Sequence, residues 1–173
     1  LARDAADVLL PFAPNAATDV TGFGLLGHVH ELASRSGVRA VVESAALPLL
    51  PGALELAESG VRTGGDRRNR DFAGPHVESF APGALEALAY DPQTAGGLLV
   101  SLPAEQGPVL EATFGARGLF VARVGHVEAG AGVVLRSAGA LLDAVEHRRD
   151  ELAAAEAGIA TLRDEEVAAI EAA

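Results

Sequence analysis

Apolar side chains fall at helical spacing in some stretches of the chain and in short continuous runs in others. Residues 25–36 have apolar positions three and four apart and stop at Gly37, so they predict a helix that ends there. The rest of the pattern predicts, in chain order, a short strand at Val38–Glu43, a helix from Pro51 to Gly60, a loop at Val61–Pro75, an edge strand at His76–Phe80, a helix at Pro82–Tyr90, a buried strand at Gly97–Leu102, a short helix at Pro108–Phe114, and a long strand at Leu119–Val127 that pairs with Val133–Leu135. Because strands and helices interleave without a regular βαβ period, the pattern favours an α+β class, with helices packed on a layered mixed β-sheet, over a doubly wound fold.

The last part of the chain has a different character. From Ala138 on it is rich in Ala and Glu and patterned for helix, and residues 137–173 carry a net charge of −6. Val145, Leu152 and Ile159 repeat every seven positions, as in a weak coiled coil. The pattern favours the alternative, a solvated helical extension or part of a hairpin. The pattern predicts three parts: residues 1–14 as the end of a preceding helix or linker, residues 15–136 as the α+β domain, and residues 137–173 as an acidic helical extension of unknown role.

The composition excludes several kinds of chemistry. The chain has no Cys, Met or Trp, and all 13 of its basic residues are Arg. It therefore has no disulfide, thiol nucleophile or Cys-bound metal, and no P-loop or Schiff-base lysine. The net charge of −11 disfavours nucleic acid as a partner, and no apolar run approaches the roughly 20 residues that a membrane crossing needs. We expect a soluble, cytoplasmic protein and, since there is no initiator Met, a piece of a longer one.

A glycine pattern opens the predicted helix at residues 25–36. Gly22, Gly24 and Gly27 form G-x-G-x-x-G, and Glu43 follows 19 residues after the second glycine, as in a dinucleotide-binding fingerprint. That fingerprint needs a buried parallel strand directly before the first glycine, whereas residues 15–21 are largely polar. The pattern therefore disfavours nicotinamide or flavin binding.

The same segment has features that suit phosphate. Its glycines allow the backbone to approach a ligand closely, and the start of the helix presents free N–H groups. Asp19 just upstream offers a carboxylate oxygen of the kind that Mg²⁺ prefers. The alternative is that Asp19 only caps a turn and the glycines only permit tight packing, and the residues alone leave both open.

Two further segments are candidates for ligand contact. Gly64–Arg70 places three Arg within four residues, which suits a phosphate or nucleotide but equally a solvated loop whose Arg side chains pair with nearby acids. Asp91–Gly97 starts with an Asp-Pro turn and ends with two glycines. The segment is either a helix-to-strand connection or a loop that contacts a ligand through Gln93 and Thr94.

The histidines give no catalytic or metal-binding pattern. His28 and His30 lie two apart on a predicted helix and so face different ways, and a metal pair there would need a spacing of four. We predict that the five histidines, His28, His30, His76, His126 and His147, do not cluster, and we interpret them as structural or surface residues. No Ser lies in a nucleophile turn, so a Ser-His-Asp triad is not supported.

Taken together, these segments resemble one family. The chain contains, in order, T-D-V-T-G-F-G-L-L-G-H, L-P-L-L-P-G-A-L-E-L-A, G-G-D-R-R-N and D-P-Q-T-A-G-G-L-L-V. Over about residues 15–136 it resembles the C-terminal half of selenophosphate synthetase (selenide, water dikinase), of the aminoimidazole ribonucleotide synthetase superfamily. The resemblance does not cover the tail.

The resemblance implies an enzyme that makes selenophosphate from selenide, ATP and water with Mg²⁺ and releases AMP and phosphate. It implies an N-terminal domain that binds ATP and forms a homodimer, and a C-terminal α+β domain that closes the site. It assigns Asp19 to the magnesium ions on the ATP phosphates. It assigns the following residues to the ATP and phosphate side of the cleft: Thr18, Thr21, Gly22, Gly24, Asn69, Gln93 and Thr94. Asp66 stands where the family usually has Thr or Ser, and Ala95 where it usually has Ser, and a carboxylate at position 66 would repel phosphate.

In that family the reactive Cys or selenocysteine and the essential Lys lie in the N-terminal segment, and this chain contains neither residue type. We therefore expect no catalytic residue within these 173 positions, no dikinase activity of the chain alone, and at most weak ATP binding. The competing hypothesis is a non-enzymatic binding or scaffold module of the same fold that uses the acidic tail as its contact surface.

Overall fold

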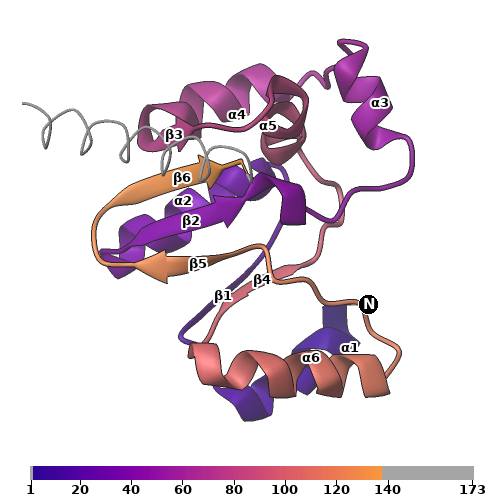
Figure 1. Cartoon of the computed structure of the whole chain (residues 1–173), viewed down its shortest axis with the longest axis vertical. Coiled ribbons are helices and arrows are strands. Elements are labelled where there is room, and N and C mark those ends of the chain that lie inside the picture. The colour runs from indigo at the N-terminus through magenta and orange to yellow at the C-terminus, as the bar shows by residue number, and fades with distance from the viewer. Residues whose placement is uncertain (1, 138–173) are drawn as a thin grey trace, which may run out of the picture. The chain divides into compact units, whose positions relative to one another are not determined.

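The computed structural model of the chain describes residues 2–137 (Figure 1). The predicted tail from Ala138 on, with its seven-residue repeat and His147, lies outside the described residues. The helices are α1 (Ala2–Leu9), α2 (Gly24–Ser36), α3 (Ala53–Glu58), α4 (Asp66–Ala73), α5 (Gly83–Tyr90) and α6 (Gly107–Ala116), with short 3-10 turns at Leu10–Phe12, Ser44–Ala46, Gly74–His76 and Ala104–Gln106. The strands are β1 (Ala16–Asp19), β2 (Arg39–Glu43), β3 (Val77–Ser79), β4 (Leu98–Ser101), β5 (Gly125–Glu128) and β6 (Gly132–Arg136).

Four of these strands form a mixed sheet in the order β3-β6-β2-β5. β6 runs parallel to both of its neighbours, while β5 runs antiparallel to β2 at the edge. β3 lies at the opposite edge, as predicted for residues 76–80. The mixed sheet with packed helices confirms the α+β class.

The main core lies between this sheet and α2. Leu26, Val29 and Ala33 on α2 are buried against Val42 of β2 and Leu135 of β6. Two helices, α4 and α5, pack on α2 in turn. The helix begins and ends within one residue of the prediction and stops before Gly37.

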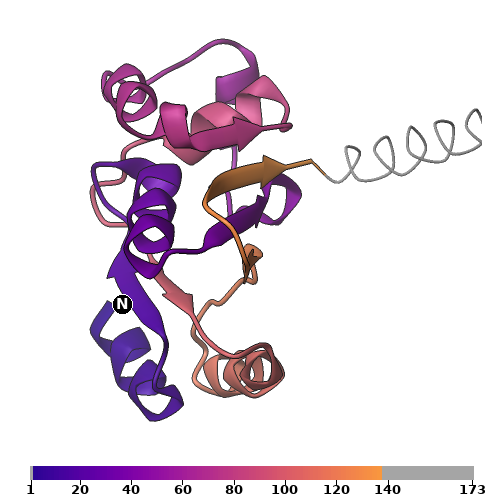
Figure 2. The ribbon, with the colours of Figure 1, turned by 90° about the vertical axis from the view of Figure 1, so that its left-hand side faces the viewer.

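A second, smaller core lies away from the four-stranded sheet, between α1 and α6 (Figure 2). Val8 and Leu9 of α1 are buried there with Leu110 and Phe114 of α6. The two-stranded antiparallel ribbon of β1 and β4 joins this smaller core to the rest, and Leu98 and Val100 pack against it. The segment predicted as a helix end or linker, residues 1–14, therefore contains a helix that packs in this core.

The predicted long strand at Leu119–Val127 is wrong. Only β5 is a strand in this stretch, and it pairs with β2 instead of with residues 133–135. The apolar side chains of Leu119 and Val121 pack in the smaller core, so the chain must cross from one core to the other before β5 begins. An apolar run predicts burial but not which partner covers it.

Two other predictions need correction. The predicted loop at residues 61–75 contains α4, an eight-residue helix of which only Asn69 and Ala73 are buried. The strand predicted as buried at residues 97–102 is β4, whose residues are half-buried because it belongs to a two-stranded ribbon and not to the central sheet. Among the described residues, no helix is long and apolar enough to cross a membrane.

Candidate functional site

The first and third candidate segments lie side by side. Beyond the ribbon of β1 and β4, the N–H of Val20 donates to the carbonyl of Gly97 at 2.9 Å, and the N–H of Gly96 donates back to Val20 at 3.1 Å. The N–H of Gln93 then donates to the carbonyl of Thr21 at 3.0 Å. Backbone hydrogen bonds therefore fix residues 93–97 along residues 20–21.

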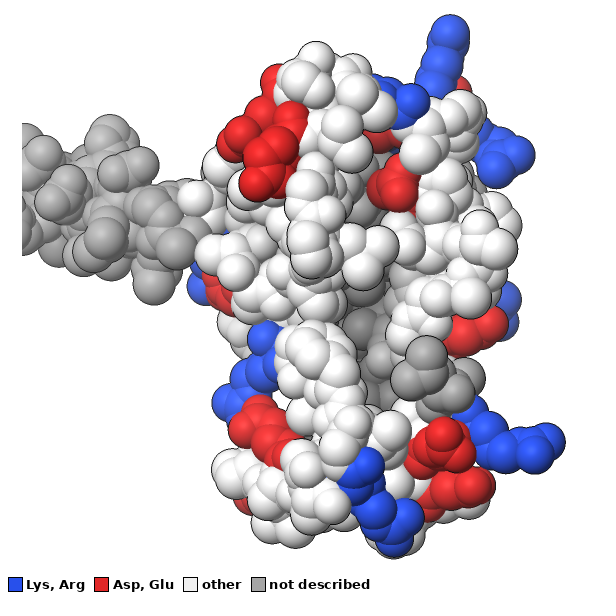
Figure 3. All heavy atoms as spheres, turned by 90° about the vertical axis from the view of Figure 1, so that its right-hand side faces the viewer, with Lys and Arg blue, Asp and Glu red and all other residues white. Residues whose placement is uncertain are grey.

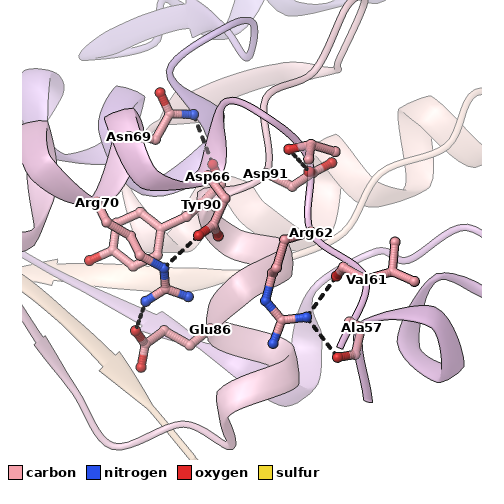
Figure 4. A network of polar contacts seen from close by, with 10 residues as sticks. Ala57, Val61, Arg62, Asp66, Asn69, Arg70, Glu86, Tyr90 and Asp91 are labelled. Carbon is pink, nitrogen blue, oxygen red and sulfur yellow. Dashed lines mark hydrogen bonds and ion pairs between the residues drawn. The ribbon is translucent and has the colours of Figure 1, made fainter. Parts of the chain in front are cut away.

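The second segment is held to both of the others. The Asn69 side chain on α4 donates from Nδ2 to the carbonyl of Gly22 at 3.0 Å and to that of Tyr90 at 2.8 Å. The hydroxyl of Thr63 donates to Oδ1 of Asp91 at 2.7 Å. Figure 4 shows Asn69 reaching Tyr90 beside the neighbouring polar contacts of α4 and α5. The three segments, far apart in sequence, therefore converge on one place.

The turn at residues 21–24 is fixed from several sides. Its first N–H, that of Thr21, donates to Nε2 of His28 at 3.0 Å, and its carbonyl also accepts from Gly24 at 3.0 Å. Gly24 has φ +69°, and a Cβ there would lie 2.6 Å from the carbonyl oxygen of Tyr90. Only glycine fits this position, both for its backbone conformation and for the close approach of α5.

The outer side of this turn is open. Gly22 and Phe23 are exposed, and a Cβ on Gly22 would meet nothing within 4 Å. In the described part of the chain, the N–H groups of Gly22 and Phe23 have no hydrogen-bond partner, and no side chain caps α2. Unpaired N–H groups followed by the start of a helix are suited to an anion.

Asp19 lies at the end of β1, two residues before this turn, and is exposed. Residues 2–137 hold no group of three or more His, Asp or Glu side chains that could enclose a metal ion. Mg²⁺ does not require such a group, because it commonly uses one or two carboxylates together with substrate phosphates and water. An exposed carboxylate beside an open, N–H-rich turn fits that mode of binding.

The charge of Asp66 is offset within the protein. Its Oδ2 accepts from Nε of Arg70 at 3.0 Å, and Arg70 also forms an ion pair with Glu86 on α5 and lies 4.6 Å over the ring of Tyr90 (Figure 4). Burial disfavours the charged guanidinium, but the hydrogen bonds that it donates to Glu86 and Asp66, together with the charges of these carboxylates, outweigh burial and raise the pKa of Arg70. The carboxylate of Asp66 thus takes part in holding α4 against α5.

The surface charge on one face is mixed. In Figure 3, Arg side chains lie in separate groups, most of them beside acidic side chains, and a broad uncharged strip runs down the middle. This face therefore lacks the continuous basic surface that binds a nucleic acid backbone.

Comparison with known proteins decides the family. Residues 3–137 match the family described as "AIR synthase related protein, C-terminal domain". The chain belongs to this family. The resemblance indicated by its four motifs is thereby confirmed.

The curated relatives of this AIR synthase related domain include several selenide, water dikinases. The protein of that name from Pseudomonas straminea is 48% identical over 120 residues, which cover 68% of this chain and 34% of that protein. The one from Pelobacter propionicus is 41% identical over 126 residues, or 72% of this chain and 36% of that protein. Among solved structures, thiamine-monophosphate kinase from Stenotrophomonas maltophilia K279a matches 73% of this chain and 32% of its own, with a TM-score of 0.52 and 25% identity. The chain spans about a third of the length of the curated relatives it matches.

Within the AIR synthase related domain, the predicted site residues differ in their access to solvent. Three of them are exposed to solvent: Asp19, Gly22 and Thr94. Three are half-buried: Thr18, Thr21 and Gln93. The other two, Gly24 and Asn69, are buried. Asn69 has no exposed surface, and its side chain contacts the turn from behind through the carbonyl of Gly22. Gln93 donates from its side chain to its own loop at Asp91, at 3.2 Å.

The dinucleotide alternative is excluded by the strand before the glycines. That alternative requires a parallel strand that runs into Gly22. β1 is instead antiparallel to β4, ends at Asp19 and belongs to a two-stranded ribbon. The glycines of this domain do not follow a Rossmann strand.

The statement that the histidines do not cluster is wrong for one pair. His30 on α2 and His76 after α4 stack with ring centroids 4.2 Å apart and planes 5° apart, because the end of α4 brings His76 onto α2. The sequence also did not identify His28 as a partner of the turn. It is buried on α2 four residues after Gly24, and that spacing on a buried helix face was the available signal.

Proposed function

We propose that this chain is the C-terminal part of a selenide, water dikinase, which makes selenophosphate from selenide, ATP and water and releases AMP and phosphate. The observation that carries this proposal is the convergence of three family segments on an open turn beside Asp19. The relatives that carry the name selenide, water dikinase support it.

Phosphoryl transfer depends mainly on the positioning and neutralisation of phosphate charge. The unpaired N–H groups of Gly22 and Phe23 suit phosphate oxygens, and the start of α2 adds the positive end of a helix dipole. The exposed Thr94 and the half-buried Thr18 and Thr21 lie in the same segments and carry hydroxyl groups. In our proposal these groups orient the ATP phosphates.

Asp19 would hold Mg²⁺ at this site. When bound, the metal neutralises negative charge on the phosphate oxygens. The carboxylate of Asp19 would otherwise repel a phosphate at the neighbouring turn, so its exposed position there suits a cation between the two anions.

The rest of the proposed active site lies outside this sequence. A reactive Cys or selenocysteine and an essential Lys are expected on an N-terminal, ATP-binding domain that also forms the homodimer, and the present chain has no residue of these types. We propose that the enzyme works in the cytoplasm, that the 173-residue chain alone has no dikinase activity, and that the tail from residue 137 is an acidic helical extension.

Activity of the full-length protein tests the proposal. Purified full-length protein is mixed with ATP, Mg²⁺ and selenide under anaerobic conditions, and products are followed by ³¹P NMR. We expect selenophosphate and AMP in the presence of selenide and neither product from the 173-residue chain. Full-length protein that forms no AMP with selenide would favour the binding-module hypothesis, and AMP formation by the 173-residue chain would contradict the division of the active site.

A further inference from the structure

His28 lies behind the open turn, on the buried face of α2. Its side chain is 6% exposed, and its ring meets that of Phe23 edge-on, with centroids 5.8 Å apart. Nε2 lies 3.0 Å from the backbone nitrogen of Thr21 and 3.2 Å from its hydroxyl oxygen. The histidine therefore contacts the turn through one ring nitrogen.

The chemistry of this contact fixes the tautomer. A backbone N–H can only donate, so Nε2 must be the unprotonated nitrogen and the proton of the neutral ring lies on Nδ1. Nδ1 is buried and has no hydrogen-bond partner among the described residues. The side chain is thus a neutral imidazole whose one polar contact is with Thr21.

This contact explains which N–H groups of the turn are available. The N–H of Thr21, in the peptide group between Val20 and Thr21, donates to His28. The carbonyl of Gly22, in the peptide group between Gly22 and Phe23, accepts from Asn69, so the peptide groups before and after the Thr21–Gly22 peptide are both fixed by side chains. The next two N–H groups, those of Gly22 and Phe23, are the unpaired ones. If the acceptor on His28 is lost, the N–H of Thr21 is left without a partner in a half-buried position, and the peptide that leads into the turn keeps only the hydrogen bond from Gly96 to the carbonyl of Val20.

We infer that His28, through its unprotonated Nε2, is a positioning residue that holds the Val20–Thr21 peptide at the start of the turn, so that the following N–H groups of Gly22 and Phe23 face the ATP phosphates. This inference rests on the proposed function. His28 acts through Thr21 and does not touch the reacting atoms.

A merely structural role for His28 is the competing explanation, because a buried ring also fills space behind the turn, where it packs on Phe23. Two substitutions separate the roles in the full-length protein. His28→Gln keeps an acceptor oxygen near the position of Nε2, whereas His28→Leu fills the space without an acceptor. His30→Leu is the matched control, since His30 lies two residues along α2, stacks on His76 and, within residues 2–137, makes no hydrogen bond to the turn.

Selenide-dependent AMP formation is measured together with the melting temperature of each variant. In His28→Leu we expect kcat/KM for ATP to fall about 10- to 100-fold, which corresponds to the free-energy cost of a buried N–H that has lost its hydrogen-bond acceptor. In His28→Gln we expect kcat/KM to stay within about threefold of wild type. His30→Leu should keep wild-type kcat/KM whatever it does to the melting temperature. Equal kcat/KM for His28→Leu and wild type, or equal losses in the Leu and Gln variants, would overturn the inference.

A second measurement does not depend on activity. In the ¹⁵N-histidine-labelled 173-residue chain, long-range ¹H–¹⁵N spectra at neutral pH distinguish the two tautomers, and we expect His28 to carry its proton on Nδ1. A proton on Nε2 would overturn the inference, since that nitrogen could not accept from Thr21. An inactive wild-type full-length protein would instead overturn the proposed function, and the positioning role would fall with it.

Discussion

The side-chain amide of Asn69 donates to the main-chain carbonyl of Gly22, 47 positions earlier in the chain, at 3.0 Å. Its buried Nδ2 also reaches the carbonyl of Tyr90, so one side chain ties the turn to α4 and α5. The NH₂ group of an amide can donate to both carbonyls, whereas an ionised carboxylate of the same shape has no donor, which explains why Asn and not Asp stands at this position.

Asn69→Asp should destabilise the fold strongly. The substitution replaces a donor by an oxygen that faces two carbonyl oxygens in a buried site, which costs at least about 2 kcal/mol. Urea unfolding of the 173-residue chain measures the change. Asn15→Asp makes the same replacement at an exposed position and serves as the control. Similar unfolding free energies for the two variants would contradict the role assigned to Asn69.

Substitution by alanine should affect stability very differently at the two glycines of the turn. Gly24→Ala forces a side chain into left-handed backbone and against the carbonyl of Tyr90, which should cost about 2–4 kcal/mol of stability. Gly22→Ala meets nothing within 4 Å and should leave the unfolding free energy within about 1 kcal/mol of wild type. In the full-length protein its methyl group should raise KM for ATP, because it occupies the open side of the turn. A Gly22→Ala protein that is stable and has wild-type KM would place the phosphate elsewhere.

Asp19→Asn should separate activity from stability. In full-length protein we expect Mg²⁺-dependent turnover to fall about 100-fold or more, because the loss of the carboxylate weakens the hold on the metal that stabilises charge on the phosphates in the transition state. Because Asp19 is exposed, the unfolding free energy should change by no more than about 0.5 kcal/mol. Asp71→Asn, an exposed acid on α4, is the control and should leave turnover unchanged. Equal turnover and magnesium dependence in Asp19→Asn and wild type would contradict the metal-ligand assignment.

The stacked histidine pair should make stability depend on pH. Burial, and then the nearby charge of His76, lower the pKa of His30 below its ordinary value of 6.5, against a smaller opposing effect of Glu31. The unfolded chain therefore binds the proton more readily than the folded chain, so this contribution to stability is present above about pH 6.5 and is lost as the pH falls through the lowered pKa.

Melting temperatures between about pH 7.5 and pH 5 test this expectation. His30→Phe keeps an aromatic ring beside Phe72 but cannot take up a proton, so its melting temperature should fall less on acidification than that of wild type. His126→Gln, at an exposed position on β5, should retain the wild-type slope. If His30→Phe also retains the slope, the pair does not control this pH dependence.

The elements with a clear apolar pattern could be predicted from the sequence. α2 and β2 have apolar residues on the faces that meet in the main core, and their predicted limits are correct within a residue. α4 could not be predicted in this way. Its buried positions are one polar residue, Asn69, and one small residue, Ala73, so the helix has no apolar stripe, and the preceding Gly64 and Gly65 suggest a loop.

The candidate site could be predicted as separate segments but not as one place. Asp19 and the glycines were identified because their residue types suit phosphate and magnesium. Their connection to Asn69 depends on hydrogen bonds from side chain to backbone, which leave no periodic pattern in a sequence. His28 was missed for the same reason, because its role depends on where one ring nitrogen lies in the folded chain.

The ribbon of β1 and β4 makes the smaller core relevant to the site. Asp19 stands directly opposite Leu98, and the Leu98 side chain packs against the smaller core, which contains Phe114. A residue such as Phe114 contributes about 3–5 kcal/mol through its packing, so its loss would loosen the strand that carries the carboxylate. During evolution, substitutions in α1 and α6, which bear no reacting group in our proposal, would thus adjust how firmly Asp19 is held and with it the catalytic rate.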